Sequence, residues 1–340
     1  MSEPMVSNRV EGHGVPTLGA PRLFFGVPVS GKAMRRISGV LLLSVALAIC
    51  IAPWVVTAYI QSVLLLFFMY VALAASWNLI SGYTGYFSFG HIAYFGLGSY
   101  VAALAITRLG MHWFLASVVA AVAAAVAAAI VSYPTLRIKG PAFVIITLAF
   151  SQALRVAVYI FDGITGGGNG ISLSPVKSLD AVYFAFAGAA LSAVAGTWLI
   201  DRSAFGRKLK AIRDDEFAAE AIGVDTGSEK LKAFVLSAVL PAFCGGVYAW
   251  YLSYVHPEEA FSLHMNVSMI VMVLLGGAGT VFGPVVGAAL VFLVSEALWA
   301  QFPLLHQLIF GFALMALVLF APDGLAGLLR RRWPNGKQQA

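Results

Sequence analysis

The chain has 340 residues, of which 60% are hydrophobic and only 11% are charged. Soluble domains carry about 45–50% apolar and about 25% charged residues, so this composition excludes an ordinary soluble enzyme and a disordered protein. The formal net charge of +6 is concentrated at the ends of apolar segments rather than on one soluble face, which argues against a nucleic-acid binder. We interpret the chain as an all-α polytopic membrane protein.

Long stretches without charge predict the membrane-spanning helices. One crossing needs about 20 apolar residues, and the 71 residues between Arg36 and Arg108 contain no Asp, Glu, Lys or Arg. We divide this stretch at Gln61-Ser62 and at the glycine-rich turn 81–85. In all we predict about eight to ten spans, drawn from the segments 37–60, 62–80, 87–107, 112–133, 140–160, 181–200, 233–255, 267–278, 284–298 and 303–321.

The basic residues indicate the orientation of these spans, because positively charged short loops stay in the cytoplasm. With ten alternating segments and a cytoplasmic N-terminus, 18 Lys and Arg residues fall on the inside, while Arg108 and Lys177 fall outside and Arg155 lies within a span. Both termini are therefore expected in the cytoplasm. Residues 1–36 are predicted to be a tail without a secretory signal, residues 37–325 the membrane domain, and residues 326–340 a second tail.

The first glycine-rich element is Gly82-Tyr83-Thr84-Gly85-Tyr86-Phe87-Ser88-Phe89-Gly90-His91, with Gly96 and Gly98 after it. This composition makes a poor continuous helix, and irregular backbone at membrane depth is tolerated only where protein or a water-filled cavity covers it. One interpretation is a broken or re-entrant element that lines a solute path. The other is a tight turn followed by close helix packing through small residues.

A second glycine-rich element lies in the other half of the chain, at Gly276-Gly277-Ala278-Gly279-Thr280-Val281-Phe282-Gly283-Pro284, with Gly287 after it. The flanking apolar pieces are short for full spans, so the segment 267–298 is expected either to cross twice or to re-enter. Glycine-interrupted segments in both halves of a transporter point to a solute site near the midplane. Close packing of helix backbones is the alternative role for each glycine.

Two further segments are candidates for contact with a solute. Thr165-Gly166-Gly167-Gly168-Asn169-Gly170 is either an anion-binding backbone nest or a flexible surface turn. In the span 140–160, Thr147, Ser151 and Arg155 share one helix face, with Gln152 beside it. A charged residue within a span marks a functional site or a buried pair, and snorkelling toward the membrane surface explains Arg155 equally well. Glu296 is its candidate partner.

The segment 201–232 is the only long charged stretch, with seven acidic and seven basic residues. Within it, 215–223 is predicted to form a short helix that ends at Gly223, with Phe217, Ala221 and Ile222 as a small apolar face. Such a helix suits docking into the groove of a partner protein. The alternative is a solvated linker.

Patterns for catalysis and metal binding are missing from the sequence. The six histidines are scattered, and no H-E-x-x-H, no cysteine pair and no G-x-S-x-G occurs. Cys50 and Cys244 lie in apolar runs and predict no disulfide. We therefore expect a protein without catalytic residues, cofactor or metal.

Together these segments resemble one family, the permease subunit of branched-chain amino-acid ABC importers. The resemblance covers roughly residues 65–325 and rests on the order and spacing of several blocks. The blocks are Trp77-Asn78-Leu79-Ile80-Ser81 through His91, Thr147-Leu148-Ala149-Phe150, 165–171, Phe205-Gly206-Arg207 to Ala211-Ile212-Arg213, 218–223 and Leu274-Leu275-Gly276-Gly277-Ala278-Gly279-Thr280.

The resemblance implies functional residues in two regions. The Ala-Ala-x-x-x-Gly core of 218–223 matches the coupling helix that contacts the ATP-binding subunit, although the leading Glu stands one place early and Leu240-Pro241 comes late. The residues it implies for coupling are Arg213, Glu216, Ala218, Ala219, Glu220 and Gly223. The translocation path is predicted, from resemblance and polarity, to include Tyr83, Phe87, Ser88, His91, Thr147, Ser151, Arg155, Gly276, Gly277 and Gly279.

The resemblance also implies an assembly in the bacterial inner membrane. Its expected members are two ATP-binding subunits, a second homologous permease that forms a heterodimer with this chain, and a periplasmic solute-binding protein in contact with outside segments such as 256–264. Membrane lipid is an expected partner and nucleic acid is not. Branched-chain amino acids are the default solute, with urea, short amides or other small carboxylates as the alternative. The competing classes of function are a stand-alone ion-coupled transporter, a passive channel and a membrane enzyme.

Overall fold

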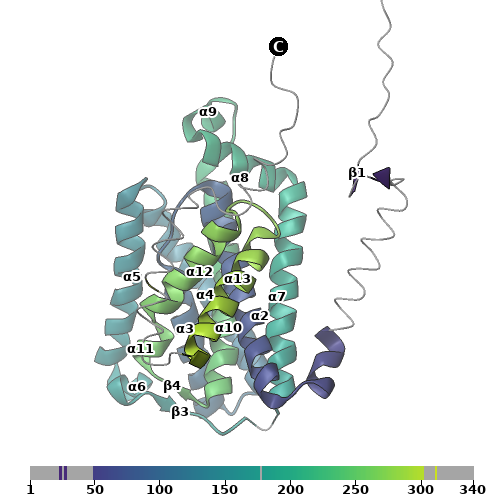
Figure 1. The fold of residues 1–340 in the computed structure, drawn as a ribbon. Coiled ribbons are helices and arrows are strands. Elements are labelled where there is room, and N and C mark those ends of the chain that lie inside the picture. The colour runs from purple at the N-terminus through teal and green to yellow at the C-terminus, as the bar shows by residue number, and fades with distance from the viewer. Residues whose placement is uncertain (1–22, 25–26, 29–48, 177, 302–310, 312–340) are drawn as a thin grey trace, which may run out of the picture. The chain divides into compact units, whose positions relative to one another are not determined.

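The computed structural model describes residues 23–24, 27–28, 49–176, 178–301 and 311 (Figure 1). The chain divides into two units, residues 1–55 and 56–340, which are described separately. In the first unit, β1 (Leu23–Phe24) pairs antiparallel with β2 (Val27–Pro28), and residues 49–55 are helical. Most of the predicted span 37–60, most of the first tail, nearly all of the predicted span 303–321 and the whole second tail lie outside the described residues.

The second unit begins with α2 (Ala58–Trp77), whose last turn widens into the π-helix η1 (Asn78–Gly82). Thr57 caps α2 by accepting a hydrogen bond from the amide of Ile60. The predicted division at Gln61-Ser62 is therefore wrong, because both residues lie inside α2. Gln61 is buried there and donates to Asp180 Oδ1 at 2.6 Å, so a polar partner from another helix stabilises it within the bundle.

Three helices follow with short connections, namely α3 (His91–Leu109), α4 (Trp113–Thr135) and α5 (Pro141–Ile160). Gly110 ends α3 in the left-handed conformation, and a proline at the first position starts α5 after Gly140. The buried face of α4 is made of small residues, including Ala116, Ala120, Ala124 and Ala128. Small side chains let helix backbones approach closely, and α4 packs against α3 and α10.

At the loop after α5, short elements cover the ends of the helices. These are α6 (Asp162–Thr165), the 3-10 turn η2 (Gly167–Asn169) and β3 (Ile171–Ser172), which pairs antiparallel with β4 (Tyr254–Val255). The helix α7 (Leu179–Arg202) then returns along α2.

The predicted charged segment is shorter than expected. It contains α8 (Ala204–Asp214) and α9 (Glu216–Ala221), and the long helix α10 already begins at Thr226 and runs to Leu252. Residues 226–232 therefore belong to a spanning helix and not to a linker. The first turns of α10 tolerate charge because Lys208 pairs with Glu229 at 2.9 Å and Lys230 with Glu216 at 2.7 Å.

The predicted segment 267–298 forms two helices. The short α11 (Pro257–Ala260) leads into α12 (Leu263–Gly276), and α13 (Gly283–Gln301) packs against α12 and α2. A Cβ at Gly276 would collide with the Gly283 backbone, and one at Gly287 with the Met272 carbonyl. The glycine spacing therefore serves the close approach of α12 and α13.

The connections gather at two ends of the helical unit. The basic end comprises residues 82–90, 134–140, 201–230 and 277–283, which share hydrogen bonds and ion pairs. The opposite end comprises residues 109–113, 161–178 and 253–262, where Arg108 donates to the carbonyls of Gly163 and Ile164. Figure 1 shows α8 and α9 at one end and α6, β3 and β4 at the other. This sorting matches the alternation that the sequence predicted.

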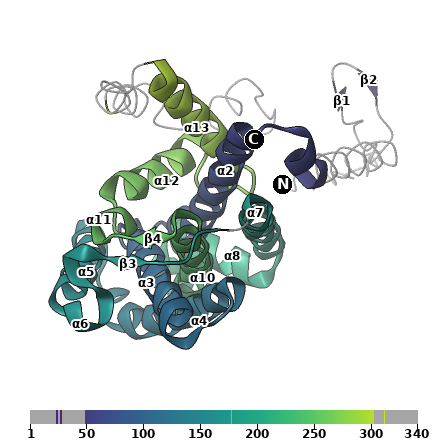
Figure 2. The ribbon, with the colours of Figure 1, turned by 90° about the horizontal axis from the view of Figure 1, so that it is seen from below.

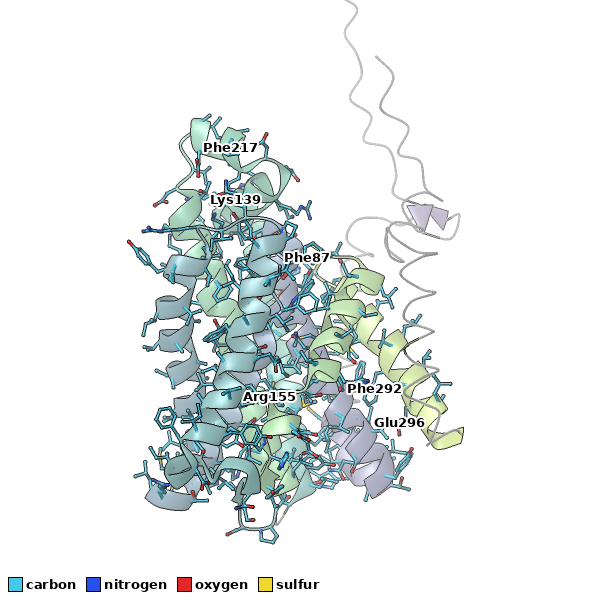
Figure 3. All side chains as sticks on the ribbon, turned by 90° about the vertical axis from the view of Figure 1, so that its left-hand side faces the viewer. Phe87, Lys139, Arg155, Phe217, Phe292 and Glu296 are labelled. Atoms are coloured by element: carbon cyan, nitrogen blue, oxygen red, sulfur yellow. The ribbon has the colours of Figure 1, made fainter. Side chains whose placement is uncertain are left out.

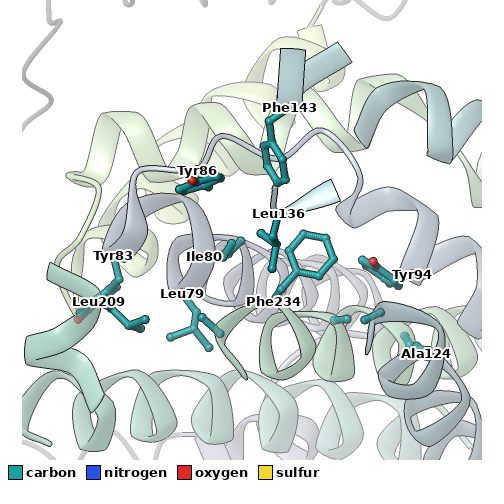
Figure 4. Close-up of a cluster of buried hydrophobic side chains, with 14 residues drawn as sticks. Leu79, Ile80, Tyr83, Tyr86, Tyr94, Ala124, Leu136, Phe143, Leu209 and Phe234 are labelled. Atoms are coloured by element: carbon teal, nitrogen blue, oxygen red, sulfur yellow. The ribbon is translucent and has the colours of Figure 1, made fainter. Parts of the chain in front are cut away.

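Helices α3 and α10 lie at the centre of the unit, with α4, α5, α7 and α2 around them (Figure 2). A core cluster near the basic end joins the glycine-rich connection to α4, α5 and α10 through Tyr86, Leu136, Phe143 and Phe234 (Figure 4). The rings of Tyr86 and Phe143 meet edge to face with centroids 5.2 Å apart. This packing fixes the floor of the site described below.

The prediction of an all-α polytopic membrane protein is confirmed. Among the described residues, seven helices are long and apolar enough to cross a membrane, over 58–82, 91–109, 113–135, 141–160, 179–202, 226–252 and 257–276, and 283–298 is a shorter apolar helix. The total number of spans stays a prediction, as does the position of both termini.

We expect Gly98→Ala to destabilise the protein, because a Cβ at Gly98 would collide with the backbone of Ala242 where α3 and α10 cross. Overpacking of this kind costs about 1–3 kcal/mol, so the apparent Tm of the purified protein in mild detergent should fall by several degrees. Gly188→Ala is the matched control, since a Cβ at Gly188 in α7 meets nothing. An equal Tm for the two variants would contradict this packing.

Candidate functional site

The connection between α2 and α3 is largely buried, apart from Gly85 and Phe87, although residues 85–90 are not helical. The indole of Trp77 donates to the carbonyl of Ser88 at 2.7 Å, and the amide of Ser88 donates to the Ser81 hydroxyl at 3.2 Å. Backbone groups at membrane depth need such internal partners. The chain thus folds back on the end of its own helix.

The next residue of this connection is held by two other helices. The amide of Phe89 donates to Thr147 Oγ1 of α5 at 3.0 Å, and its carbonyl accepts from Asn266 Nδ2 of α12 at 2.9 Å. Asn266 is fully buried, and its Oδ1 has no hydrogen-bond partner among the described residues. Of the two interpretations offered above, the geometry supports the broken element rather than a simple tight turn.

His91 begins α3 and lies in this buried polar region, with no exposed surface. Its Nδ1 lies 3.3 Å from Ser88 Oγ and its Nε2 lies 3.0 Å from Ser237 Oγ of α10. Both ring nitrogens therefore have hydroxyl partners. Within the described residues, His91 acts as a link between the connection and α10.

The two glycine-rich elements meet at the basic end through Asn78. Its Nδ2 donates to the carbonyl of Thr280 at 2.9 Å, and its Oδ1 accepts from the amide of Gly279 at 2.8 Å. A Cβ at Gly82 would collide with the Asn78 side chain and the Gly279 backbone, so glycine is required at this crossing. Elements 200 residues apart in sequence are joined here.

Arg213 from α8 closes the same cluster. Its Nη1 donates to the carbonyl of Gly82 at 3.1 Å. A Cβ at Gly279 would collide with this guanidinium group, and Gly279 has a positive φ of 75° that disfavours other residues. The charged segment is thus attached directly to both glycine-rich elements.

Glu216, the first residue of α9, makes a second attachment. Its carboxylate lies 2.7 Å from Lys230 Nζ of α10, 2.7 Å from the Tyr86 hydroxyl and 3.3 Å from Lys139 Nζ. Burial acts to raise the pKa of this carboxyl, but the hydrogen bonds from Lys230 and Tyr86 outweigh it, so the pKa lies below its ordinary value. Burial and the bond to Glu216 raise the pKa of Tyr86, which stays a neutral donor.

Tyr83 provides a third attachment at the start of the connection. Its hydroxyl donates to Asp201 Oδ1 at 2.9 Å, and Lys210 Nζ of α8 lies 2.6 Å from the same oxygen. Burial, followed by the bond to this carboxylate, raises the pKa of Tyr83. The tyrosines at both ends of 83–86 thus bind the charged segment through its carboxylates.

A cavity of about 610 Å³ lies between the connection, the start of α5 and the charged segment. Its lining combines charged groups with apolar side chains and includes Tyr86, Phe87, Lys139, Phe143, Val144, Arg213 and Glu216. Phe87 is 42% exposed, so one predicted path residue faces open space beside this cavity. The size lies within the range of small-molecule pockets, about 300–1,000 Å³.

The outer surface of α9 carries exposed apolar side chains. Phe217 is 74% and Ile222 is 78% exposed, and Ala218 and Ala221 are exposed beside them. Lys139 Nζ lies 4.2 Å from the centroid of the Phe217 ring. The predicted apolar face therefore exists and points away from the bundle. Figure 3 labels Phe217 at the tip of this end.

The six residues predicted for coupling divide into two groups. Arg213, Glu216 and the buried Ala219 face the helical unit, whereas Ala218, Glu220 and Gly223 are exposed. The first group positions α9, and the second lies on the surface that a partner would contact.

Several predicted path residues are drawn together and others are not. Tyr83 and Ser88 lie in the connection, and His91 of α3 and Thr147 of α5 bind to it. Gly276, Gly277 and Gly279 lie at the end of α12 and in the turn that follows it. Ser151 is buried on α5, where its hydroxyl donates to Leu148. Arg155 lies on the same helix, half-buried, and has no hydrogen bond or ion pair with another described residue.

The candidate pairing of Arg155 with Glu296 is wrong. Glu296 Oε1 accepts a hydrogen bond from the Tyr59 hydroxyl at 2.8 Å, so its partner comes from α2. Figure 3 labels Arg155 and Glu296 on different helices.

The geometry of the glycine loop 165–170 supports the surface-turn interpretation. The amides of Gly167, Asn169 and Gly170 donate within the loop, and that of Gly166 donates to the carbonyl of Asp162 in α6. Among the described residues, no group of three or more His, Cys, Asp or Glu is placed to hold a metal ion.

Five residues of the site were missed by the sequence analysis, namely Asn78, Tyr86, Lys139, Lys230 and Asn266. Asn78 and Tyr86 stand inside the matched block, so their place beside the glycines was a signal. Lys230 was counted in the charged segment 201–232. Only the fold shows that it is buried and paired with Glu216. Asn266 is one asparagine among apolar residues. That pattern indicates a buried polar side chain but does not identify its partner.

A scan against protein-family models matches residues 59–319 to the family described as "Branched-chain amino acid transport system / permease component". The chain is 26% identical to the high-affinity branched-chain amino acid transport system permease protein LivM of Escherichia coli (strain K12), over 93% of this chain and 81% of that protein. The corresponding LivM of Salmonella typhimurium is 27% identical, over 89% of this chain and 82% of that protein.

A shorter match of 35% identity covers 28% of this chain and 29% of the autoinducer 2 import system permease protein LsrC of Klebsiella pneumoniae. No solved structure matches the chain.

We expect Glu216→Ala to lower the stability of the basic end, because it leaves Lys230 buried without its carboxylate. Breaking a buried pair costs about 3–5 kcal/mol. The apparent Tm in detergent should therefore fall by several degrees. Asp214→Ala is the control, since Asp214 is 74% exposed and forms only a surface pair with Arg213 at 3.6 Å. Equal effects of the two variants would show that the buried pair is not stabilising.

The pKa of Glu216 also predicts a pH dependence. Because it is lower in the folded chain, the ionised carboxylate stabilises the fold above the unfolded pKa, near 4.3, and this contribution is lost as the pH falls through the folded pKa. Amide-hydrogen protection of residues 216–224, corrected for intrinsic exchange, should stay constant from about pH 8 to about pH 5 and then fall. Glu216→Gln should abolish this acid step. Loss of protection between about pH 8 and 6 would contradict it.

Asn78→Asp should separate the two glycine-rich elements, because a carboxylate has no hydrogen to donate to the carbonyl of Thr280. An unpaired buried acceptor costs about 1–3 kcal/mol, and the buried charge adds to that cost. Proteolysis of the 277–282 turn in detergent should become faster than in the wild type. Asn169→Asp in the exposed 165–170 loop is the control. An unchanged cleavage rate in Asn78→Asp would contradict the bridge.

Proposed function

The chain belongs to the family of permease components of branched-chain amino acid transport systems, and we propose that it forms half of the path of an ATP-driven importer for branched-chain or related amino acids. The observation that carries this proposal is the attachment of α9, a helix with exposed apolar residues, to the first glycine-rich element. Glu216 of α9 binds Tyr86, and Arg213 of the preceding α8 binds Gly82. As a member of this family the chain is a subunit of an ABC importer and a multi-pass membrane protein.

We place the basic end in the cytoplasm, because short loops rich in Lys and Arg stay inside. The proposed location is the bacterial inner membrane. Residues 37–325 form the permease domain in this proposal, with 1–36 and 326–340 as cytoplasmic tails. The connection between α7 and α10, residues 203–225, then extends toward the cytoplasmic subunits, and α9 is its outermost helix.

The proposed partners follow from the assembly of the family. Two ATP-binding subunits supply the energy, one of them against Phe217, Ala218, Ala221 and Ile222. A second homologous permease completes the path as a heterodimer, and a periplasmic binding protein delivers the solute to segments such as 256–264 at the opposite end. The chain itself has no catalytic role in this proposal, since ATP is hydrolysed by its partners.

In the proposed cycle, closure of the ATP-binding subunits moves α9. The hydrogen bond of Glu216 to Tyr86 and that of Arg213 to Gly82 carry this movement to the first glycine-rich element. The hydrogen bonds of Asn78 to Gly279 and Thr280 carry it on to the second. Those elements meet α5, α10 and α12 at buried polar contacts, so a small displacement changes the packing around the path. A loaded binding protein favours the outward state only through its higher affinity for that state.

The solute is proposed from the LivM relatives, whose names state branched-chain amino acids. Urea, short amides and other small carboxylates are the alternatives within ABC permeases. An ion-coupled secondary transporter is disfavoured because it leaves the exposed apolar residues of α9 without a partner. The same surface disfavours a passive channel.

The test is a pull-down of the tagged chain from its native membranes in mild detergent, followed by reconstitution of what comes with it. Co-purification of ATP-binding proteins and a second permease, with leucine uptake that requires ATP and the binding protein, is the expected result. Purification of the chain alone, with solute flux into liposomes without ATP, would contradict the proposal and favour a secondary transporter or channel.

We expect the double variant Phe217→Ala/Ile222→Ala to lose the ATP-binding subunits at least about tenfold in this pull-down, because the apolar anchors that act as hot spots of an interface contribute about 2 kcal/mol or more each. Its Tm as an isolated chain should match the wild type, since both side chains are exposed. Ile130→Ala is the control, being 69% exposed on α4 away from α9. If the double variant retains the ATP-binding subunits, α9 is not the surface on which they dock.

A further inference from the structure

A second cavity, of about 350 Å³, lies between α2, α12 and α13. None of the residues that line it belongs to the path predicted from the sequence. Its volume lies within the range of small-molecule sites, about 300–1,000 Å³. It is thus a separate candidate for contact with the solute.

The polar lining of this cavity lies toward the opposite end of the bundle. Tyr59 and Ser62 stand at the start of α2, His264 at the start of α12, and Ser295 and Glu296 in the last two turns of α13. Three helices therefore bring hydroxyl groups, an imidazole and one carboxylate to the same mouth.

About one turn or more deeper along each helix the lining becomes mainly apolar. Leu66 follows on α2, Met272 on α12, and Val291 and Phe292 on α13. The ring of Phe292 lies 5.8 Å from that of Tyr70, centroid to centroid, which closes the floor. The cavity has a polar mouth and an apolar floor, which matches a small solute with a charged head and a hydrocarbon tail.

Glu296 sets the charge of the mouth. A carboxylate in an apolar helix is costly and marks a functional site, yet no Lys or Arg is among the residues that line this cavity. Its hydrogen bond comes from the neutral Tyr59 hydroxyl at 2.8 Å. His264 is the one basic side chain in this lining, so no permanent positive charge stands beside the carboxylate there, and a cationic ligand group would supply one.

We propose that this cavity binds the solute by its ammonium group. Glu296 receives the ammonium, the hydroxyl of Ser295 is available to the solute carboxylate, and Leu66, Met272 and Phe292 contact the branched side chain. This inference rests on the proposed function and narrows its solute class to amines and amino acids. Carboxylic acids without an amine are repelled, and urea, being neutral, gains nothing from Glu296.

The test uses the intact complex with its partner permease and ATP-binding subunits, without the binding protein. The complex is placed in nanodiscs of phosphatidylcholine and phosphatidylglycerol, which carry no primary ammonium group that would compete. Binding is measured as displacement of labelled leucine by leucine, by isoamylamine, which lacks the carboxylate, and by isocaproate, which lacks the amine. Leucine and isoamylamine should compete, and isocaproate should not.

Glu296→Gln keeps the shape of the side chain. It should weaken the binding of leucine and of isoamylamine by at least about tenfold, as expected for loss of a charge-assisted hydrogen bond. Glu258→Gln is the control, since Glu258 is exposed on α11 outside the cavity, and it should bind as the wild type does. Tyr59→Phe keeps the charge and should change binding less than Glu296→Gln. An unchanged Tm without ligand shows that each variant is folded.

Equal competition by isocaproate and leucine would overturn the inference, as would wild-type affinity in Glu296→Gln. ATP-driven leucine uptake by the wild-type complex, measured in parallel with the binding protein present, separates this failure from that of the proposed function. If the wild-type complex takes up leucine and Glu296→Gln also binds and transports leucine normally, only the proposed ammonium site is contradicted. Absence of any ATP-driven amino-acid uptake by the wild type removes the proposed function itself.

Discussion

A helix that is interrupted inside a membrane must find partners for the backbone groups that the interruption frees. In this protein the interruption follows α2, and the partners come from different helices. Thr147 of α5 and Asn266 of α12 bind the two backbone groups of Phe89, and Arg213 of α8 binds the carbonyl of Gly82. The same hydrogen bonds that satisfy the backbone therefore tie the surrounding helices and the charged segment to one short connection.

This constraint explains why the charged segment is so firmly held. Glu216 meets Lys230, Tyr86 and Lys139 in a partly buried cluster, so α9 is fixed to the bundle on one side while its apolar residues stay exposed on the other. A buried pair of this kind adds little net stability over an apolar contact. Its value is geometric, because it sets the position of α9 relative to the glycine-rich elements.

Much of the fold follows from local sequence, whereas the partners within the site do not. Apolar runs located the helices from α3 to α7, and alternating basic loops placed their ends. Gln61 was mistaken for a loop because its partner, Asp180, lies on another helix. Residues 226–232 were placed in the charged cytoplasmic segment because charge in isolation indicates solvent, whereas they begin α10. The glycines marked both elements of the site, but only the fold shows that Asn78 joins them and that Glu296 binds Tyr59 rather than Arg155.

The central claim is that α9 and the connection 83–90 act as one unit. A double-mutant cycle of Tyr86→Phe and Glu216→Gln tests it, with solute transported per ATP hydrolysed by the reconstituted complex as the readout. We predict that the effects of the two changes are not additive, with an interaction energy of about 0.5–3 kcal/mol, as for residues in contact that act together. Additive effects, within about 0.3–0.5 kcal/mol, would contradict the claim and show that the two segments act independently.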